Sequence, residues 1–165
     1  MPIDPQTFRT IMGHYPTGVC VVTAVTPEGT AVGMTVGTFT SVSLDPPLIG
    51  FFPDRRSTSW PGIAAAGRFC VNVLADDQEH LGRQFASKGG DKFVGVAHRV
   101  SDSGLPLLDG AVAWIECSLY SVGDAGDHVL VLGEVETLSA EHTASPLVFH
   151  KGAFRQVAYP VPAVA

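Results

Sequence analysis

The sequence contains only three cysteines, Cys20, Cys70 and Cys117, and each lies in an apolar run far from the other two. No CxxC pair and no cluster of cysteine with histidine occurs, which argues against a zinc site and against a redox dithiol. We therefore expect buried free thiols in a reducing compartment, no bound metal, and a cytoplasmic location.

Charged residues are scarce as well. Asp, Glu, Lys and Arg make up 16% of the 165 residues, against 45% hydrophobic residues. So small a charged fraction suggests that a partner covers some apolar surface, and a symmetric homodimer is the simplest candidate. The net charge of −6 argues against binding to nucleic acid or to an anionic membrane. A ligand that carries phosphate would need a local positive site.

Several familiar motifs are missing. No apolar run approaches the roughly 18 residues that a membrane-spanning helix needs. The first ten residues, MPIDPQTFRT, lack the basic head and apolar segment of a signal peptide. Neither a Gly-x-Gly-x-x-Gly loop nor a Walker A loop occurs, so a nicotinamide cofactor would not be held as in a Rossmann fold. These absences weigh against an ordinary dehydrogenase and favour a protein that meets NAD(P)H only transiently.

The residue pattern predicts one mainly β domain with three short helices. The first helix begins at Asp4 and Pro5, the second spans 57–66 with Ser57 or Ser59 as its cap, and the third spans 76–85. In the third helix, Asp76 is the expected cap and Glu79 completes a capping box. Strands are expected at 19–26, 30–36, 39–44, 48–52, 69–74, 94–100, 113–122, 129–138 and 147–150, with a hairpin turn at 123–126. This spacing of strands and turns suggests a small closed or partly open β-barrel.

Residues 33–48, GMTVGTFTSVSLDPPL, combine hydroxyl and apolar side chains. Residues 38–44 alternate as a strand does when one face lies on a core. The other face would carry a row of hydroxyls able to hold a flat heteroaromatic ring by its polar edge, with Gly33 and Gly37 giving close access to the backbone. Prolines 46 and 47 would end the strand. The alternative is an ordinary Thr/Ser-rich strand on a half-exposed sheet.

The run TVGTFTSVSLDPPL, residues 35–48, resembles the flavin-binding segment of the flavin reductase-like family. Members are small NAD(P)H:flavin oxidoreductases that supply reduced flavin to two-component monooxygenases. Further segments occur in the family's order: STSW at 57–60, RFCVNVL at 68–74, QFA at 84–86, GDH at 126–128 and PLV at 146–148. The resemblance implies a single domain over 1–165 with its core at about 7–157. It also implies a six-stranded Greek-key FMN-binding split barrel that forms a homodimer.

The implied reaction is hydride transfer from NADH or NADPH to FAD or FMN, followed by release of the reduced flavin to a separate monooxygenase. The cofactor-binding residues that the resemblance implies are Thr35, Val36, Gly37, Thr38, Ser41, Val42, Arg56, Ser57, Thr58, Ser59, Phe85, Ala86, His150, Lys151, Gly152 and Phe154. The sequence departs from the family at Gly37, where relatives often carry Asn or Ser. This loss of a side-chain donor leaves the choice between FMN and FAD open.

Two of these positions also have a reading from the residues alone. Residues 55–59 combine two arginines and three hydroxyls at a predicted helix start, which favours a phosphate; the alternative is a capped helix in a solvated loop. Phe85 either lies against the flavin or is a core residue. Asn72 interrupts an apolar strand and is expected to make a buried hydrogen bond.

His128 is the candidate catalytic residue. It follows Gly126 and Asp127, where a turn would leave it at a rim. The resemblance implies that this segment lies beside the flavin and contacts the nicotinamide, so His128 would position the hydride donor or buffer charge near it. The alternative is a turn histidine paired with Asp127.

Other functions stay open at this point. The chain could be a non-catalytic flavin- or haem-binding barrel, an oxidase of the pyridoxamine-phosphate-oxidase type, or a structural dimer module. Few basic residues lie outside 55–56, which disfavours a phosphorylated amine as the substrate. No extra basic group for a 2′-phosphate is evident, which favours NADH over NADPH.

Overall fold

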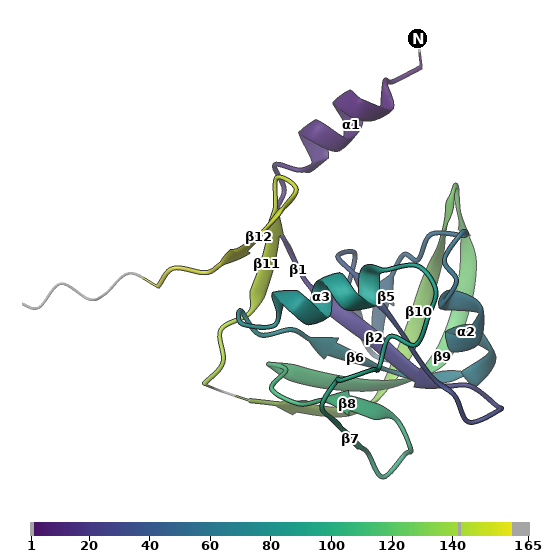
Figure 1. The fold of residues 1–165 in the computed structure, drawn as a ribbon. Helices are drawn as coiled ribbons and strands as arrows, with labels where there is room; N and C mark the ends of the chain where they lie inside the picture. Colours follow the sequence, from purple (N-terminus) through teal and green to yellow (C-terminus); the bar gives the residue numbers. More distant parts are fainter. Residues whose placement is uncertain (1, 142, 160–165) are drawn as a thin grey trace, which may run out of the picture.

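The structure, a computed structural model, describes residues 2–141 and 143–159 (Figure 1). Its elements in chain order are α1 (Pro5–Met12), β1 (Thr17–Gly18), β2 (Cys20–Val25), β3 (Ala31–Val36), β4 (Thr40–Leu44), β5 (Pro47–Phe51), α2 (Trp60–Ala66), β6 (Arg68–Val73), α3 (Glu79–Ala86), β7 (His98–Val100), β8 (Pro106–Leu108), β9 (Ala113–Ala125), β10 (His128–Ala140), β11 (Leu147–His150) and β12 (Ala153–Gln156). The prediction of a mostly β fold with a few short helices is confirmed.

The main sheet is antiparallel, with the strand order β3-β2-β6-β9-β10-β5-β4. Its two edge strands, β3 and β4, are joined by residues 37–39 alone, so the two edges must approach each other and the sheet curls. The N–H of Phe52 donates to Oγ1 of Thr38 at 2.9 Å and ties this link to the end of β5. Within the described residues, no ladder joins β3 to β4, so the sheet curls without closing.

The hydrophobic core fills the inside of this curl, around Val22, Phe51 and Phe69. A second cluster lies on the other face of β2, where α3 covers the strand and buries Phe85 completely. Gly33 makes this packing possible, because a Cβ atom there would lie 2.7 Å from the Phe85 ring. Phe85 therefore packs as a core residue and fixes α3 against β3.

Helix α1 lies apart from the sheet (Figure 1). Asp4 caps it as predicted, since its carboxylate accepts the N–H of Thr7 at 2.8 Å. No residue of the helix is buried, and Phe8, Ile11 and Met12 expose more than half of their surface. One backbone bond, from Lys151 N–H to Gly13 O, links the end of the helix to the β11–β12 hairpin. The single chain therefore leaves an apolar helix face uncovered.

Both remaining helices begin later than predicted. The Ser57 hydroxyl accepts the N–H of Trp60 at 3.1 Å and folds residues 57–59 into a turn, so α2 starts at Trp60. Helix α3 starts at Glu79, because residues 75–78 form a turn in which the Gln78 N–H donates to Ala75 O and the Ala75 N–H donates to Gln78 Oε1, each at 3.0 Å. The predicted capping box is wrong.

The hairpin turn was also misplaced. Strands β9 and β10 pair as far as Ala125 and His128, so the turn consists of Gly126 and Asp127 instead of residues 123–126. The strand expected at 94–100 is reduced to β7, which pairs with β8, a strand the sequence did not predict. Asn72 makes the buried bonds expected of it: its Nδ2 donates to Val21 O at 2.9 Å and its Oδ1 accepts from Leu108 N at 2.8 Å. These bonds fasten β8 to the main sheet.

Among the described residues, no helix is long and apolar enough to cross a membrane. Nor does this part of the chain contain a group of His, Cys, Asp or Glu side chains arranged to hold a metal ion.

Candidate functional site

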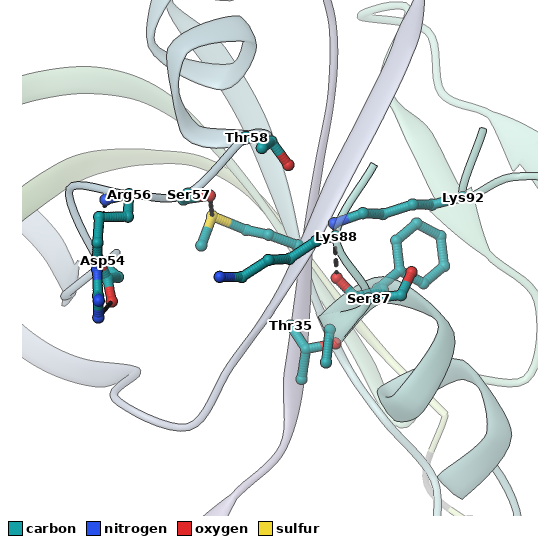
Figure 2. A pocket seen from close by; sticks show the side chains of 11 residues that line it. Thr35, Asp54, Arg56, Ser57, Thr58, Ser87, Lys88 and Lys92 are labelled. Carbon is teal, nitrogen blue, oxygen red and sulfur yellow. Dashed lines mark hydrogen bonds and ion pairs between the residues drawn. The ribbon is translucent and has the colours of Figure 1, made fainter. Parts of the chain in front are cut away.

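A pocket opens between strand β3, residues 54–58 and the end of helix α3 (Figure 2). It is lined by Met34, Thr35, Asp54, Arg56, Ser57, Thr58, Phe85, Ala86, Ser87, Lys88 and Lys92. Six of the predicted cofactor-binding residues therefore meet here, from segments that are far apart in the sequence. We call this cavity the polar pocket.

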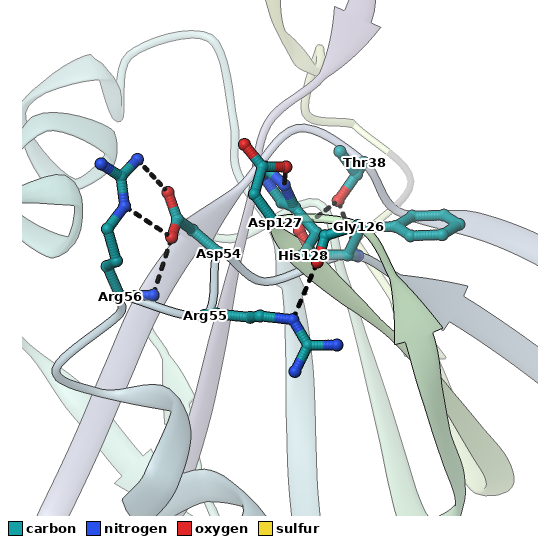
Figure 3. A network of polar contacts seen from close by, with 8 residues as sticks. Thr38, Asp54, Arg55, Arg56, Gly126, Asp127 and His128 are labelled. Atoms are coloured by element: carbon teal, nitrogen blue, oxygen red, sulfur yellow. Dashed lines mark hydrogen bonds and ion pairs between the residues drawn. The ribbon is translucent and has the colours of Figure 1, made fainter.

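Arg55 and Arg56, which the sequence suggested as phosphate-binding residues, both form ion pairs with aspartates. Arg55 points to the β9–β10 turn, where its Nη2 lies 2.5 Å from Asp124 and its Nε donates to Gly126 O at 2.9 Å (Figure 3). Arg56 lines the polar pocket but pairs with Asp54 at 2.9 Å. Hydrogen bonds from Arg56 hold the pKa of Asp54 at about 2, well below its usual value. The expected positive charge of residues 55–56 is thus largely neutralised.

Positive charge in the polar pocket comes instead from two lysines, neither of which was among the predicted site residues. Lys88 and Lys92 enter the polar pocket from the loop after α3, opposite Ser57 and Thr58 (Figure 2). The ion pairs found in the described part of the chain involve neither lysine. Partial burial lowers the pKa of Lys92, because desolvation disfavours its charged form. The only signal in the sequence was a pair of lysines in a glycine-rich loop.

A second cavity of about 540 Å³ adjoins the polar pocket and shares Thr35, Ala86 and Ser87 with it. Its walls include Gly37 and two aromatic rings, Phe149 and Phe154, whose centroids lie 5.3 Å apart in an edge-on arrangement. The Arg83 guanidinium lies 5.0 Å from the centroid of the Phe154 ring. We call this cavity the aromatic pocket; its size and its apolar walls suit a flat ring system.

The hydroxyls of residues 33–48 do not form the single open row that the sequence predicted. Thr35 borders both pockets, but its Oγ1 donates to Gly82 O at 2.7 Å and holds α3 in place. Thr38 bonds to Phe52, and Ser41 and Val42 are exposed on the edge strand β4. Val36 is buried in the core, so any contact it makes with a ligand would come from its backbone.

Ser59 is buried beneath the polar pocket. Its Oγ accepts a hydrogen bond from Lys92 Nζ at 3.0 Å, and the same Nζ donates to Phe85 O at 3.0 Å. Ser59 therefore joins the 57–59 turn to the end of α3 through Lys92, while Ser57 and Thr58 face the cavity.

His128 lies at a rim, as expected from its place after a turn (Figure 3). Its Nδ1 lies 2.7 Å from an Asp127 carboxylate oxygen, and this bond lowers the pKa of Asp127. The structure thus confirms the predicted pairing of a turn histidine with Asp127. His128 also lines an open groove with Asp54, Arg56 and residues of α1, so the Asp54–Arg56 pair separates this groove from the polar pocket.

The C-terminal residues of the predicted set lie on two sides of the β11–β12 hairpin. Phe154 faces the aromatic pocket, whereas Lys151 and Gly152 form the hairpin turn and line a cavity with Arg9 and His14 of the α1 region. Lys151 adopts a positive φ of 51° within this turn, beside Gly152 at 75°. His150, the last residue of β11, is half-buried.

The donor groups of the polar pocket suit an anionic, phosphate-bearing ligand. Two hydroxyls, of Ser57 and Thr58, face two lysines that form no ion pair with any carboxylate of the described residues, and such a set favours phosphate oxygens. The aromatic pocket continues from the same wall. A phosphate joined to a flat ring, as in a flavin nucleotide, therefore fits the two cavities together.

Comparison with known proteins agrees with this geometry. The model of the flavin reductase like domain matches residues 12–158. The chain is 57% identical over 152 residues to a flavin reductase of Pseudomonas putida, covering 92% of this chain and 89% of that protein. It is 44% identical over 152 residues to the flavin-dependent monooxygenase reductase subunit HsaB of Mycobacterium tuberculosis, covering 91% and 81%.

A solved structure is similar over the whole chain. The NADH:FAD oxidoreductase SgcE6 of Streptomyces globisporus C-1027, in complex with NAD and FAD fragments, has a TM-score of 0.89 to this structure at 35% identity, covering 100% of this chain and 99% of that one. The sequence motifs, the paired pockets and these similarities agree, and the chain belongs to the flavin reductase-like family.

Proposed function

We propose that this protein is an NAD(P)H:flavin oxidoreductase that reduces FAD or FMN and releases the reduced flavin to a separate monooxygenase. The observation that carries the proposal is the junction of the two pockets: a lysine- and hydroxyl-lined cavity opens directly beside an aromatic-walled one. Family membership and relatives named as flavin reductase, monooxygenase reductase subunit and NADH:FAD oxidoreductase support the same activity.

The bound flavin would supply the hydride acceptor, and the protein would supply binding and alignment. Ser57, Thr58, Lys88 and Lys92 would hold the flavin phosphate in the polar pocket. Backbone N–H groups near Gly37 would stabilise negative charge on the ring, which fits a position that has lost its side-chain donor. Because the task is alignment, no general base is required.

His128 would act on the hydride donor. Its groove lies across the Asp54–Arg56 pair from the polar pocket, so a dinucleotide held there would approach the flavin site from outside. Asp127 would fix the orientation of the imidazole through the bond to Nδ1. We propose His128 as the group that positions the nicotinamide, and Lys151 and Gly152 as a turn that helps to cover it.

The finer details of the fold are also proposals. We infer a single domain, a six-stranded Greek-key split barrel within the curled sheet, and a homodimer. The uncovered apolar face of α1 supports the dimer, since a lone amphipathic helix with no buried residue gains little stability from its own chain. Three free, buried cysteines support a cytoplasmic location.

One assay separates the candidate functions: purified protein with FAD or FMN and with NADH or NADPH, followed by the loss of reduced-nicotinamide absorbance. The proposal predicts oxidation of NADH that depends on added flavin, with NADH preferred to NADPH. A non-catalytic flavin- or haem-binding barrel would bind its ligand without oxidising NADH. An oxidase of the pyridoxamine-phosphate-oxidase type would instead oxidise an amine with tightly held flavin, and a structural dimer module would do neither.

A further inference from the structure

A third cavity of about 340 Å³ continues from the polar pocket. It runs between the start of strand β3, at residues 30–33, and the loop at residues 89–92. It shares Thr58 and Lys92 with the polar pocket, so the two cavities meet at these residues. We call this third cavity the loop groove.

Lys92 lies where the polar pocket and the loop groove meet, and one N–H donor of its ammonium group forms no hydrogen bond to the described residues. An ammonium group carries three N–H donors, and two of these bond to Ser59 Oγ and Phe85 O, each at 3.0 Å. The ion pairs of the described residues leave Lys92 without a carboxylate, although burial makes its charge costly. An anion at the junction would use the third donor and compensate the charge.

The loop groove itself is built differently from the polar pocket. Gly89 and Gly90 have φ values of +74° and +72°, and a Cβ atom at either would meet no heavy atom within 4 Å, so open space lies beside the backbone. Asp91 places a carboxylate along the groove, and one of its oxygens accepts the N–H of Phe93 at 2.9 Å. A carboxylate repels a phosphate but accepts hydrogen bonds from sugar hydroxyls. The groove therefore suits an uncharged nucleoside better than a second phosphate.

We propose, resting on the proposed function, that the chain takes FAD in preference to FMN, with the pyrophosphate at the Thr58–Lys92 junction and the adenosine in the loop groove. The charge of the polar pocket alone does not discriminate, because the phosphate of FMN and the pyrophosphate of FAD carry similar charges. Discrimination comes from the groove, which an FMN molecule would leave empty.

The test compares the dissociation constants of FAD and FMN for the purified 165-residue chain, measured by quenching of flavin fluorescence. We expect the wild-type protein to bind FAD at least about tenfold more tightly than FMN. Ala31→Phe places a ring in the groove and should reduce this preference about tenfold or more. Thr30→Trp, at an exposed position of the same groove, should act in the same direction and decides the matter if Ala31→Phe does not fold.

Ala140→Phe, at an exposed position at the far end of β10, is the matched control and should keep the wild-type preference. Equal or tighter binding of FMN by the wild-type protein would overturn the inference, and so would an unchanged preference in the folded groove variants. Such a failure leaves NADH-dependent reduction of both flavins intact. Failure of the proposed function would instead abolish flavin-dependent oxidation of NADH with either flavin.

Discussion

Nδ1 of His128 lies 2.7 Å from Oδ1 of Asp127 at the first residue of strand β10, beside the Asp54–Arg56 ion pair. If this imidazole positions the nicotinamide, His128→Ala should slow the reduction of bound flavin by NADH about tenfold or more while changing flavin affinity less. Stopped-flow measurement of flavin reduction at several NADH concentrations gives both values. An unchanged reduction rate together with unchanged NADH affinity would remove His128 from the site.

Substitutions of Ser57 and Thr58 should differ in their effect on stability, although both should weaken flavin binding. The Ser57 hydroxyl accepts the N–H of Trp60, so Ser57→Ala should lower the free energy of unfolding by about 1 kcal/mol as well as weaken flavin binding. Thr58 is exposed in the polar pocket, so Thr58→Ala should weaken flavin binding with little loss of stability. The double variant should raise the flavin dissociation constant about tenfold. Flavin titration and denaturant unfolding measure the two effects; wild-type flavin affinity in the double variant would rule out the phosphate assignment.

Asp54 gives a pH dependence whose sign follows from its pKa. The carboxyl has a pKa of about 2 in the folded protein, below its usual value of 3.8, because Arg56 bonds to the charged form. The resulting stabilisation is fully present above about pH 4 and is lost as the pH falls towards about 2. The stability difference between the wild type and Asp54→Asn should therefore shrink over this range, as equilibrium unfolding at a series of pH values would show. A difference that stays constant would mean that the Asp54–Arg56 pair does not form in solution.

The contact between Gly33 and Phe85 fixes the position of α3, and with it the wall of both pockets. A Cβ atom at Gly33 would lie 2.7 Å from the Phe85 ring, so Gly33→Ala should lower the free energy of unfolding by about 1–3 kcal/mol. Gly123→Ala is the control, because a Cβ atom there meets nothing within 4 Å. Denaturant unfolding of both variants checks the difference; equal stabilities would show that α3 is not packed as described.

Local chemistry made parts of the fold predictable. Asp4 followed by Pro5 correctly predicts the start of α1, and the β-branched run around Val22 correctly predicts a buried strand. In both cases the interactions that decide the local structure lie within a few residues. The start of helix α3 was predicted wrongly from local sequence, at Asp76 instead of Glu79. Asp76 has the residue type of a cap, but Gln78 is the N-cap residue, because its side chain accepts the N–H of Ala75 and closes a turn before the helix. The same side chain donates to Asp109 O at 2.7 Å, so a distant segment helps to fix where the helix begins.

In the candidate site, too, the residues that belong to a local motif were predicted and those that depend on the folded structure were not. Ser57, Thr58 and Thr35 were recognisable because their segments follow the family's pattern, and all three line the polar pocket. Lys88 and Lys92 were not predicted as site residues, because a lysine in a polar loop is ordinarily solvated. Lys92 is held at the pocket by its bonds to Ser59 Oγ and Phe85 O, whereas Lys88 lines the pocket and stays exposed. The neutralisation of Arg56 by Asp54 was missed as well, because it depends on a turn geometry that the sequence does not specify.

We propose that Lys88 and Lys92, which form no ion pair within residues 2–141 and 143–159, hold a flavin phosphate for reduction by NADH. The most direct test is steady-state oxidation of NADH as a function of FAD concentration, for the wild type and for a variant carrying Lys88→Met and Lys92→Met. We predict flavin-dependent oxidation by the wild type and a KM for FAD raised about tenfold or more in the folded variant. No flavin-dependent oxidation by the wild type, or an unchanged KM in the variant, would contradict the account.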